Sequence, residues 1–471
     1  MKTKYIFSVI VIALLCVGKV NSQIASSIQK TTLTTKDNAV LEQHLSEFTA
    51  FTMDKREIAN TLRINGAGQF RLRIDEQMDW TIDLQLNDMR APDFRQTYIS
   101  DEGKFEYESF RVNTFKGTTS DGQIARFTID ENNFFGVIFD DKFHYVIRYA
   151  KDYTENNSDK SLIVYRSSDI ISDDEHFDYI NDALEIPSDI VQQDAMIISN
   201  DAISSYTPCT YYLKIATDAD YEFYQAMGNN LTNTYSYIFS VLNIVEGVYE
   251  STFNMKFIVT YQNVWTVTSS GYPYSETNPY LLLDDFRDYW NINMTGIPRN
   301  IAHLFTGKFF VGGILGLARV QGLGTDYAYG LSRFHPQILY ILTHEIGHNL
   351  GAGDNPSAPD CHCFSNINPR SVMCQGGNSL SSLWFCQQSI NSVSPFLASN
   401  SAILTGNLPN NLTLTGTVSG FNEYQATQKI TSNQVVNSGY TVYKAGEIEL
   451  SSGFEVQLGA EFEIIIDDGC P

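Results

Sequence analysis

The sequence predicts a multidomain protein: a β-rich N-terminal domain, an α/β (α+β) domain with a mixed sheet, and a small all-β C-terminal module. Three observations lead to this prediction. The chain has 471 residues, more than a single hydrophobic core usually accommodates (~250–300 residues). Its apolar pattern is strand-like over 65–195 and becomes an alternation of strands and helices after 209. Near the C-terminus the pattern is strand-like again, with regular glycines.

The first 22 residues predict a secretory signal peptide. Lys2 and Lys4 form a basic start, an apolar stretch follows from Tyr5 to Val17, and the small residue Ser22 marks a cleavage position. A membrane anchor is the alternative, but the stretch is shorter than the ~18–20 apolar residues needed to span a bilayer. We therefore expect a secreted, extracellular protein without membrane insertion.

The composition excludes several classes of protein. Hydrophobic residues make up 43% of the chain, which is enough to build sizeable cores and argues against wholesale disorder. Acidic residues outnumber basic ones by 54 to 31, for a formal charge of -23. Such a chain lacks the cationic surface that nucleic acids require, so we expect no nucleic-acid partner. The same charge disfavours docking on an anionic membrane.

The N-terminal domain is predicted to span residues 23–200. Short alternating runs such as Phe70–Ile74 and Phe143–Ile147 are separated by turn signals such as Asp121-Gly122, which indicates an antiparallel β structure. A polar, turn-rich stretch over 187–208 follows and predicts a linker.

The central domain is predicted to span residues 205–398. Its expected elements, in order, are a strand at 211–216, a long helix over about 218–250, a strand at 253–259, a helix at 281–290, short strands at 301–305 and 316–320, and a helix at 336–350. The last of these helices ends at Gly351, a residue that suits a helix C-terminus.

The C-terminal module is predicted to span residues 409–471. Gly446, Gly453 and Gly459 separate short alternating runs. Steps of this length suggest stacked short strands, as in small β-coils. A plain hairpin meander fits the pattern equally well.

The chemistry of the chain is concentrated in the segment His-Glu-Ile-Gly-His-Asn-Leu-Gly-Ala-Gly-Asp at 344–354. On a helix, His344 and His348 project from one face, so two imidazoles can bind one Zn²⁺. Glu345 lies beside them, where it can take a proton from a water activated by the metal. Gly351 allows a sharp turn that returns Asp354 to the site as a third ligand. An ordinary amphipathic helix with two surface histidines is the alternative.

Removal of Cys16 with the signal peptide leaves six of the seven cysteines, and four of these lie between 361 and 386. An even number in an exported protein predicts disulfide bonds. A cysteine zinc site is the alternative, but Cys361-His362-Cys363 is tighter than the usual C-x2-C spacing.

The segment from His344 to Gly351 resembles the active-site helix of metzincin zinc proteases of the reprolysin/adamalysin branch. Ser371-Val372-Met373 is similar to the Met-turn of that family, and the cysteines on both sides of it are also similar. The resemblance covers roughly residues 209–395. It implies a metzincin-type catalytic domain with an active-site helix, a β-rich prodomain before it, and a zymogen. The stretch 409–471 resembles small repeat modules at the ends of secreted bacterial proteins.

Two departures from that family matter. Its third zinc ligand is normally histidine, whereas this chain has Asp354; His362 is the rival assignment. Many relatives hold the zinc with a prodomain cysteine, but this chain has no cysteine between 23 and 208. If the prodomain is an intramolecular inhibitor, it must act through a carboxylate or by steric cover.

The resemblance implies a secreted zinc metalloendopeptidase that hydrolyses protein or peptide substrates, with zinc on His344, His348 and Asp354 and with Glu345 as the general base. A catalytically weak or inactive interaction protein and a zinc amidase acting on small molecules are the alternatives. A structural Ca²⁺ at Asp218-Ala219-Asp220 is a further possibility, although a solvated helix start fits the same residues.

Overall fold

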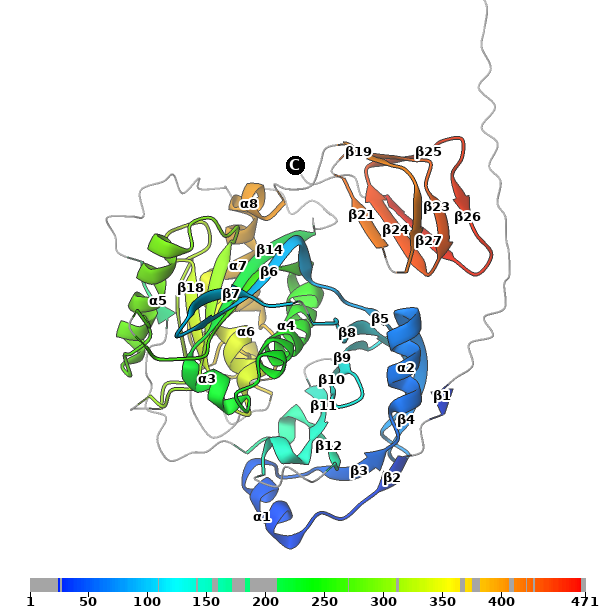
Figure 1. The fold of residues 1–471 in the computed structure, drawn as a ribbon. Coiled ribbons are helices and arrows are strands. Elements are labelled where there is room, and N and C mark those ends of the chain that lie inside the picture. Colours follow the sequence, from blue (N-terminus) through cyan, green and yellow to red (C-terminus); the bar gives the residue numbers. More distant parts are fainter. Residues whose placement is uncertain are drawn as a thin grey trace, which may run out of the picture.

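The structure is a computed structural model in which an N-terminal β domain, a central domain and a C-terminal β module lie together (Figure 1). No helix of the described residues is long and apolar enough to cross a membrane. The predicted signal peptide, the linker at 187–208, Cys209 and Cys470 lie outside the described residues. The structure describes residues 24–25, 28–108, 110–140, 143–154, 160–171, 183–186, 210–269, 271–310, 313–364, 369–374, 382–405, 411–420, 422–426 and 428–466.

The N-terminal domain is built on a ten-stranded sheet in the order β1-β4-β5-β8-β9-β10-β11-β12-β3-β2, antiparallel except for the β1–β4 pair. Alternating residues along its strands form a buried core, as the sequence predicts. Two helices accompany it, α1 (Thr35–His44) and α2 (Arg56–Asn65). The strands are β1 (Ile24–Ala25), β2 (Ile28–Lys30), β3 (Thr49–Met53), β4 (Ala67–Arg73), β5 (Asp79–Leu86), β8 (Thr114–Thr119), β9 (Ile124–Ile129), β10 (Phe134–Asp140), β11 (Phe143–Tyr149) and β12 (Leu162–Arg166).

The central domain contains an eight-stranded sheet in the order β13-β17-β18-β16-β14-β15-β6-β7. It is mixed, because β17 runs antiparallel to β18 while β14, β15, β16 and β18 pair in parallel. Its own elements are β14 (Tyr211–Ala219), α3 (Tyr221–Ala226), α4 (Leu231–Phe253), β15 (Met255–Trp265), α5 (Pro279–Asn293), β16 (Ile301–Thr306), β17 (Gly316–Arg319), β18 (Tyr329–Arg333), α6 (Ile338–Asn349), α7 (Gln387–Ser399) and α8 (Ser401–Thr405).

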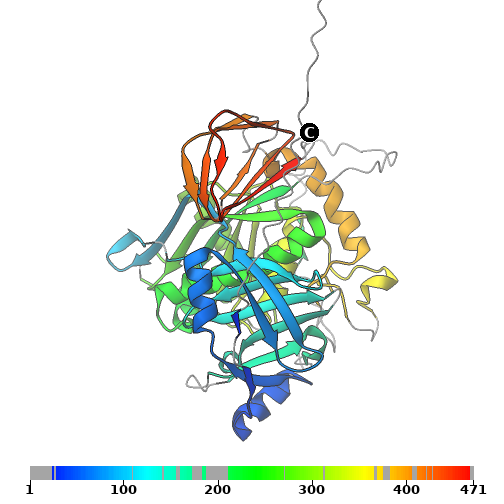
Figure 2. The ribbon, with the colours of Figure 1, turned by 90° about the vertical axis from the view of Figure 1, so that its right-hand side faces the viewer.

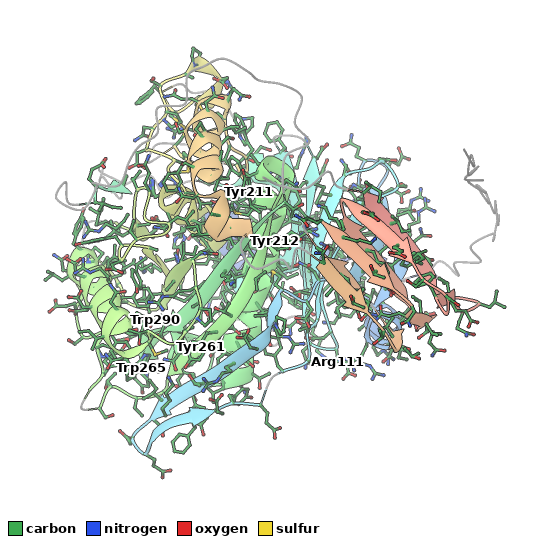
Figure 3. All side chains as sticks on the ribbon, turned by 90° about the horizontal axis from the view of Figure 1, so that it is seen from above. Arg111, Tyr211, Tyr212, Tyr261, Trp265 and Trp290 are labelled. Atoms are coloured by element: carbon green, nitrogen blue, oxygen red, sulfur yellow. A yellow bond between two sulfur atoms is a disulfide. The ribbon has the colours of Figure 1, made fainter. Side chains whose placement is uncertain are left out.

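Three strands of this sheet come from the N-terminal part of the chain. The hairpin of β6 (Arg90–Ser100) and β7 (Gly103–Glu106) joins the β15 edge, and β13 (Ala183–Leu184) joins the β17 edge. Figure 3 shows the hairpin beside the strand that carries Tyr261 and Trp265. This arrangement departs from the expectation of a self-contained β domain over 23–200. Strand patterns show which residues are buried but not which strand lies next to them.

Helix α4 lies between the two sheets. It contacts β8, β9 and β10 of the N-terminal domain on one side, and β15 and α6 of the central domain on the other. The sequence predicts one long helix over about 218–250, but the structure breaks it into α3 and α4. Between them Gly228 and Asn229 adopt left-handed backbone conformations (φ of 73° and 53°), which end a helix.

The C-terminal module is a short β-coil and not a hairpin meander. Its strands pair only in parallel in the described residues, in three three-stranded sheets that stack one coil on the next (Figure 2). The repeating coil aligns Asn411 with Lys429 and Lys429 with Glu447. The strands are β19 (Asn411–Leu414), β20 (Thr417–Ser419), β21 (Asn422–Gln425), β22 (Lys429–Ser432), β23 (Val435–Ser438), β24 (Tyr440–Ala445), β25 (Glu447–Leu450), β26 (Glu455–Val456) and β27 (Glu461–Ile466).

Candidate metal and active site

Helix α6 carries the predicted site and is buried along its whole length. Apolar residues pack around it from α4 and from the segment after residue 371. Two hydrogen bonds fix it to its neighbours: Tyr249 of α4 donates to the carbonyl of Thr343 (2.7 Å), and the Asn349 amide donates to the carbonyl of Arg319 (2.9 Å). The helix is therefore held rigidly between α4 and the sheet, as a preorganised site requires.

His344 and His348 project from one face of α6, and their ring centroids are 4.5 Å apart. The Nδ1 atom of His344 lies 2.8 Å from the carbonyl oxygen of Val372, and that of His348 lies 2.8 Å from the carbonyl oxygen of Ala352. A carbonyl oxygen only accepts, so each Nδ1 carries the proton. Each Nε2 then presents its lone pair toward the cluster, which is the tautomer that binds a metal.

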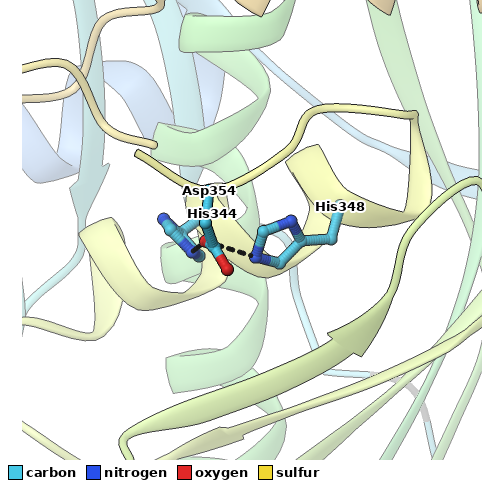
Figure 4. Close-up of side chains that lie close together, drawn as sticks. All are labelled: His344, His348 and Asp354. Atoms are coloured by element: carbon cyan, nitrogen blue, oxygen red, sulfur yellow. Dashed lines mark ion pairs between the residues drawn. The ribbon is translucent and has the colours of Figure 1, made fainter. Parts of the chain in front are cut away.

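Asp354 reaches the same point by a turn after the helix. Gly351 has a φ of 96°, in the left-handed region that glycine tolerates, and the chain reverses there. The Oδ1 atom of Asp354 lies 3.2 Å from the Nε2 atoms of both His344 and His348 (Figure 4). The sequence spacing alone predicts this return.

The three residues fit a zinc ion in the chemistry of their donors. Two imidazole nitrogens and one carboxylate oxygen lie within 4.8 Å of one another, and this donor set is common in catalytic zinc sites. Among the described residues, His344, His348 and Asp354 are the group with this property. His362, the rival ligand, is outside the group, and its Nδ1 lies 2.9 Å from the carbonyl oxygen of Pro369. The ligand assignment itself stays a prediction.

Glu345 is almost fully buried, with an exposed fraction of 1%. It faces β17, the strand at the edge of the domain's own sheet, and lies against Gly316 of that strand. A Cβ atom placed on Gly316 would stand 2.2 Å from Oε1 of Glu345. The absence of a side chain at 316 therefore makes room for this carboxylate beside the two histidines.

The segment that resembles a Met-turn passes beneath the site. Met373 is fully buried, and a Cβ on Gly347 would meet its sulfur at 2.8 Å, so the methionine packs directly against α6. The backbone of the same segment supports the ligands, since Val372 bonds His344 and the carbonyl of Met373 accepts from Asn355 (2.9 Å). Both the helix and the Asp354 turn are thereby tied to one turn segment.

Two disulfide bonds hold the loop between Asp354 and helix α7. They join Cys361 to Cys386 and Cys363 to Cys374. These pairs confirm the prediction of disulfides over a cysteine zinc site. Cross-links on both sides of Met373 stabilise the loop mainly by restricting the unfolded chain.

Sequence reasoning missed the short strand β13 at this site. Ala183 and Leu184 pair in parallel with Ala318 and Arg319 of β17. The Ala183 N–H also donates to Oδ2 of Asp354 at 3.3 Å. A two-residue strand has no periodicity to detect, so no local sequence signal could have located it.

Asp218 and Asp220 are not a solvated helix start. Both are fully buried, and burial raises the pKa of Asp218 to about 6 and that of Asp220 to about 7. Asp218 accepts hydrogen bonds from Tyr274 (2.7 Å) and Trp290 (2.9 Å), and Asp220 accepts from the N–H of Phe223 (2.7 Å) as the N-cap of α3. Protein donors therefore satisfy these carboxylates, and they give no support to a calcium site.

Comparison with known proteins agrees with this geometry. Residues 211–409 match the model of the reprolysin (M12B) family of zinc metalloproteases. Over 152 residues the chain is 28% identical to human disintegrin and metalloproteinase domain-containing protein 33. That match covers 31% of this chain and 18% of the relative. The chain thus resembles only a small part of the human protein.

The matched residues contain α6, the Asp354 turn, the disulfide-linked loop and most of the central sheet. The β-rich region before them is consistent with a prodomain. Residues 211–409 therefore resemble the reprolysin (M12B) zinc metalloproteases, the family whose model matches this part of the chain.

Proposed function

We propose that the chain is a secreted zinc-dependent endopeptidase that hydrolyses peptide bonds in protein substrates. The observation that carries this proposal is the convergence of His344, His348 and Asp354 at one point, with Glu345 beside them on the same helix. A fold retained only for binding would not need an acid at this position. The intact Glu345 therefore favours an enzyme over an inactive interaction protein.

His344, His348 and Asp354 would hold the zinc. When bound, zinc polarises a substrate carbonyl and lowers the pKa of water toward ~7. Asp354 adds a negative charge that the usual three-histidine set lacks. Such a ligand makes the metal a weaker Lewis acid, so activity is moderated without being lost.

Glu345 acts as the general base. It accepts the proton of the attacking water and returns it to the leaving amine. Its burial and its contact with Gly316 restrict the carboxylate to one position, so little reorganisation is needed during the reaction. Glu345 is not a ligand in this scheme, and it is absent from the metal-holding group.

Protein substrates would bind in an extended conformation along β17. This strand carries Gly316, which touches Glu345, so a peptide paired with it would pass the site. The position already occupied by β13 supports this role, because it demonstrates that an added strand fits there.

The N-terminal domain acts as an intramolecular inhibitor without a thiol. Three hydrogen bonds of the β13 segment support this proposal: Ala183 to Asp354 (3.3 Å), Val320 to the carbonyl of Leu184 (2.9 Å), and Arg319 to the carbonyl of Glu185 (2.9 Å). The β13 segment thereby covers the side of β17 along which we propose that substrates bind, beside the proposed zinc ligands. Inhibition is steric, in keeping with the lack of cysteine between 23 and 208.

Secretion and maturation complete the proposal. The signal peptide at 1–22 and the two disulfides both fit an oxidising, extracellular environment. Cleavage between about 187 and 208 would separate β13 from the central domain and produce the mature peptidase.

One experiment tests the function directly. The secreted protein, cut in the linker, is assayed for zinc content and for hydrolysis of casein, beside the Glu345→Ala variant. We expect one zinc per chain in both proteins, and at least about a 100-fold loss of hydrolysis in the variant. Loss of zinc in Glu345→Ala would show that its role has been misassigned. Hydrolysis of small amides without casein cleavage would indicate an amidase instead.

A further inference from the structure

The N-terminal domain supplies part of the central sheet. Strand β6 pairs in parallel with β15, aligning Arg95 with Tyr261 and Ile99 with Trp265. We call this β6–β15 pairing the seam. Backbone hydrogen bonds extend the seam at both ends: the Val259 N–H donates to the carbonyl of Met89 (2.6 Å), and the Thr266 N–H donates to the carbonyl of Ile99 (2.9 Å). β15 is therefore an interior strand, and it would become a sheet edge if the hairpin left.

Side chains across this seam form a buried polar network. The Gln96 amide donates to Gln262 (2.9 Å), and the Thr97 hydroxyl donates to Asn263 (2.7 Å). Tyr235 of α4 donates to the backbone carbonyl of Thr97 (2.6 Å). All these residues are buried, so departure of β6 would remove partners from polar groups deep in the central domain.

A second buried contact joins α4 to the N-terminal sheet. Arg126 of β9 bonds Glu250 and lies 3.8 Å from Glu246, and Arg126 and Glu246 are each no more than 3% exposed. Asn87 donates to Glu246 at 2.6 Å and to Asn243 at 2.9 Å. Removing one side of a buried ion pair leaves the other charge uncompensated, which strongly opposes separation.

Gly247 lies where helix α4 and the N-terminal sheet approach each other closely. A Cβ atom at this position would meet Cγ of Arg126 at 2.9 Å and a ring carbon of Phe139 at 3.2 Å. The glycine therefore permits α4 to seat directly on β9 and β10. Apolar packing continues through this contact, since Met89, Val137 and Val146 belong to the same buried cluster as Phe239 and Val245 of α4.

A third contact lies near the active site but outside it. His144 of β11 lies 3.0 Å from the carbonyl oxygen of Leu383, and Ser167 bonds Ser382 at 3.1 Å. Arg148 donates to the carbonyl of Pro336, just before α6 (3.1 Å). The N-terminal domain is thus attached at three separate places besides β13.

The attachment of β13 is much smaller. It comprises two paired residues and the few hydrogen bonds named above. A chain break after residue 186 would turn this segment into a free end. Its local release would cost far less than separation of the seam, the ion pairs and the shared core.

We infer that, after the chain is cut in the linker, the N-terminal domain remains bound as a non-covalent subunit while only residues 183–186 leave the β17 edge. Activation then consists of the release of one strand and not of dissociation of the domain. The contacts described above are sufficient to infer that the N-terminal domain is retained and that β13 is released. The conclusion that this release activates the protein rests on the proposed function.

The test uses the full chain with a site for a sequence-specific protease inserted between 187 and 208, and an affinity tag at the start of the N-terminal domain. After cutting, the protein is diluted to nanomolar concentration and captured by the tag. We expect both fragments in equal amounts. Recovery of the central domain in the unbound fraction would overturn retention.

Hydrogen exchange of the same sample tests the second part of the inference. Cutting should raise the exchange rate of amides in residues 316–320 at least tenfold. The exchange rates of amides in residues 255–265 should not change. Faster exchange in 255–265 would indicate dissociation, and unchanged exchange in 316–320 would indicate that β13 stays; either result overturns the inference. Neither readout depends on hydrolysis, so an inactive but captured complex would count against the proposed function alone.

A variant at the close contact adds a directed check. Gly247→Leu should reduce capture of the central domain by at least tenfold after cutting, because its side chain collides with Arg126 and Phe139. Ser251→Leu, an exposed position one turn along the same helix, is the matched control and should be captured like the wild type. Equal capture of both variants would contradict the assigned interface. The wild-type result decides the proposal even if Gly247→Leu fails to fold.

Discussion

The Glu345 carboxylate and the α-carbon of Gly316 are in direct contact. The space that a Cβ would fill at Gly316 lies 2.2 Å from Oε1 of Glu345 and 2.7 Å from its Cδ. One residue comes from helix α6 and the other from strand β17, which lies between β13 and β18 in the sheet. Strand β17 thus positions the carboxylate of Glu345, the proposed base. In turn, the Glu345 side chain on α6 leaves no room for a side chain at position 316.

Replacing that glycine should impair the reaction without removing the metal. In Gly316→Ala the new methyl group must displace the carboxylate, so we expect kcat to fall by about 100-fold or more, the scale of general-base catalysis. Zinc content should stay at one per chain. The measurement is hydrolysis of casein by the cut protein, with metal analysis of the same sample.

Two further variants sharpen this prediction. Gly296→Ala introduces the same methyl group where nothing lies within 4 Å, and it should retain activity. Glu345→Asp shortens the acid and makes room, so the combined loss in Gly316→Ala with Glu345→Asp should be smaller than the product of the single losses. Full activity of Gly316→Ala would contradict the positioning role.

The third zinc ligand can be assigned by metal content. Asp354→Ala leaves two histidines, and we expect it to lose zinc during dialysis against a weak chelator. His362→Ala should keep zinc, because His362 lies outside the metal-holding group. A full zinc complement in Asp354→Ala, or its loss in His362→Ala, would transfer the assignment to His362.

Exchanging the carboxylate for imidazole should retain the site and shift its pH dependence. Asp354→His restores a three-histidine set and should bind zinc. Without the negative ligand the metal becomes a stronger Lewis acid, so the acidic limb of the pH–rate profile should move to lower pH. An unchanged limb would indicate that Asp354 does not contact the metal.

Latency should depend on the backbone of β13 and not on a thiol. Ala183→Pro removes the N–H that donates to Asp354, so the uncut chain should show several-fold higher hydrolysis than the wild type. Ala183→Ser keeps the N–H and is the matched control. Mercurials and alkylating agents should leave the latency of the wild type unchanged; activation by either reagent would contradict thiol-free inhibition.

Acid should destabilise the central domain through His303. Burial lowers the pKa of His303 to about 3, from about 6.5 in an unfolded chain. Below about pH 6.5, His303 is therefore protonated in the unfolded state, whereas in the folded state it stays neutral until the pH falls to about 3. Stability is lost progressively as the pH falls through this window, by about 2 kcal/mol at pH 5.

A double variant isolates that effect. His303 bonds Ser332 at 2.8 Å, so His303→Phe with Ser332→Ala removes both partners and leaves no unsatisfied group. Urea unfolding at pH 7.5 and pH 5 should show a smaller acid loss in the variant than in the wild type. Asp218 and Asp220 act in the opposite direction, but they are present in both proteins and cancel in the difference. Equal losses would show that His303 is not held neutral.

Much of the site is determined locally by the sequence. The i, i+4 spacing of His344 and His348 places both rings on one helix face, and Gly351 allows the turn that returns Asp354. These relations extend over eleven residues and need only helix geometry and one left-handed residue. Most elements of the central domain up to residue 350 were predicted for the same reason, since hydrophobic periodicity reports which face of each element is buried. The helix expected over 218–250 is instead split into α3 and α4, and β18, α7 and α8 were not predicted.

Only the tertiary structure decided how the N-terminal part engages the site. The sequence is strand-like over 65–195, but it cannot show that residues 90–106 pair with β15, because any buried strand offers the same row of backbone donors and acceptors. The two-residue strand β13 is too short to show a hydrophobic periodicity, yet its Ala183 N–H donates a hydrogen bond to Asp354. Contacts between residues far apart in the chain depend on which edges meet after folding, and a local apolar pattern does not encode that choice.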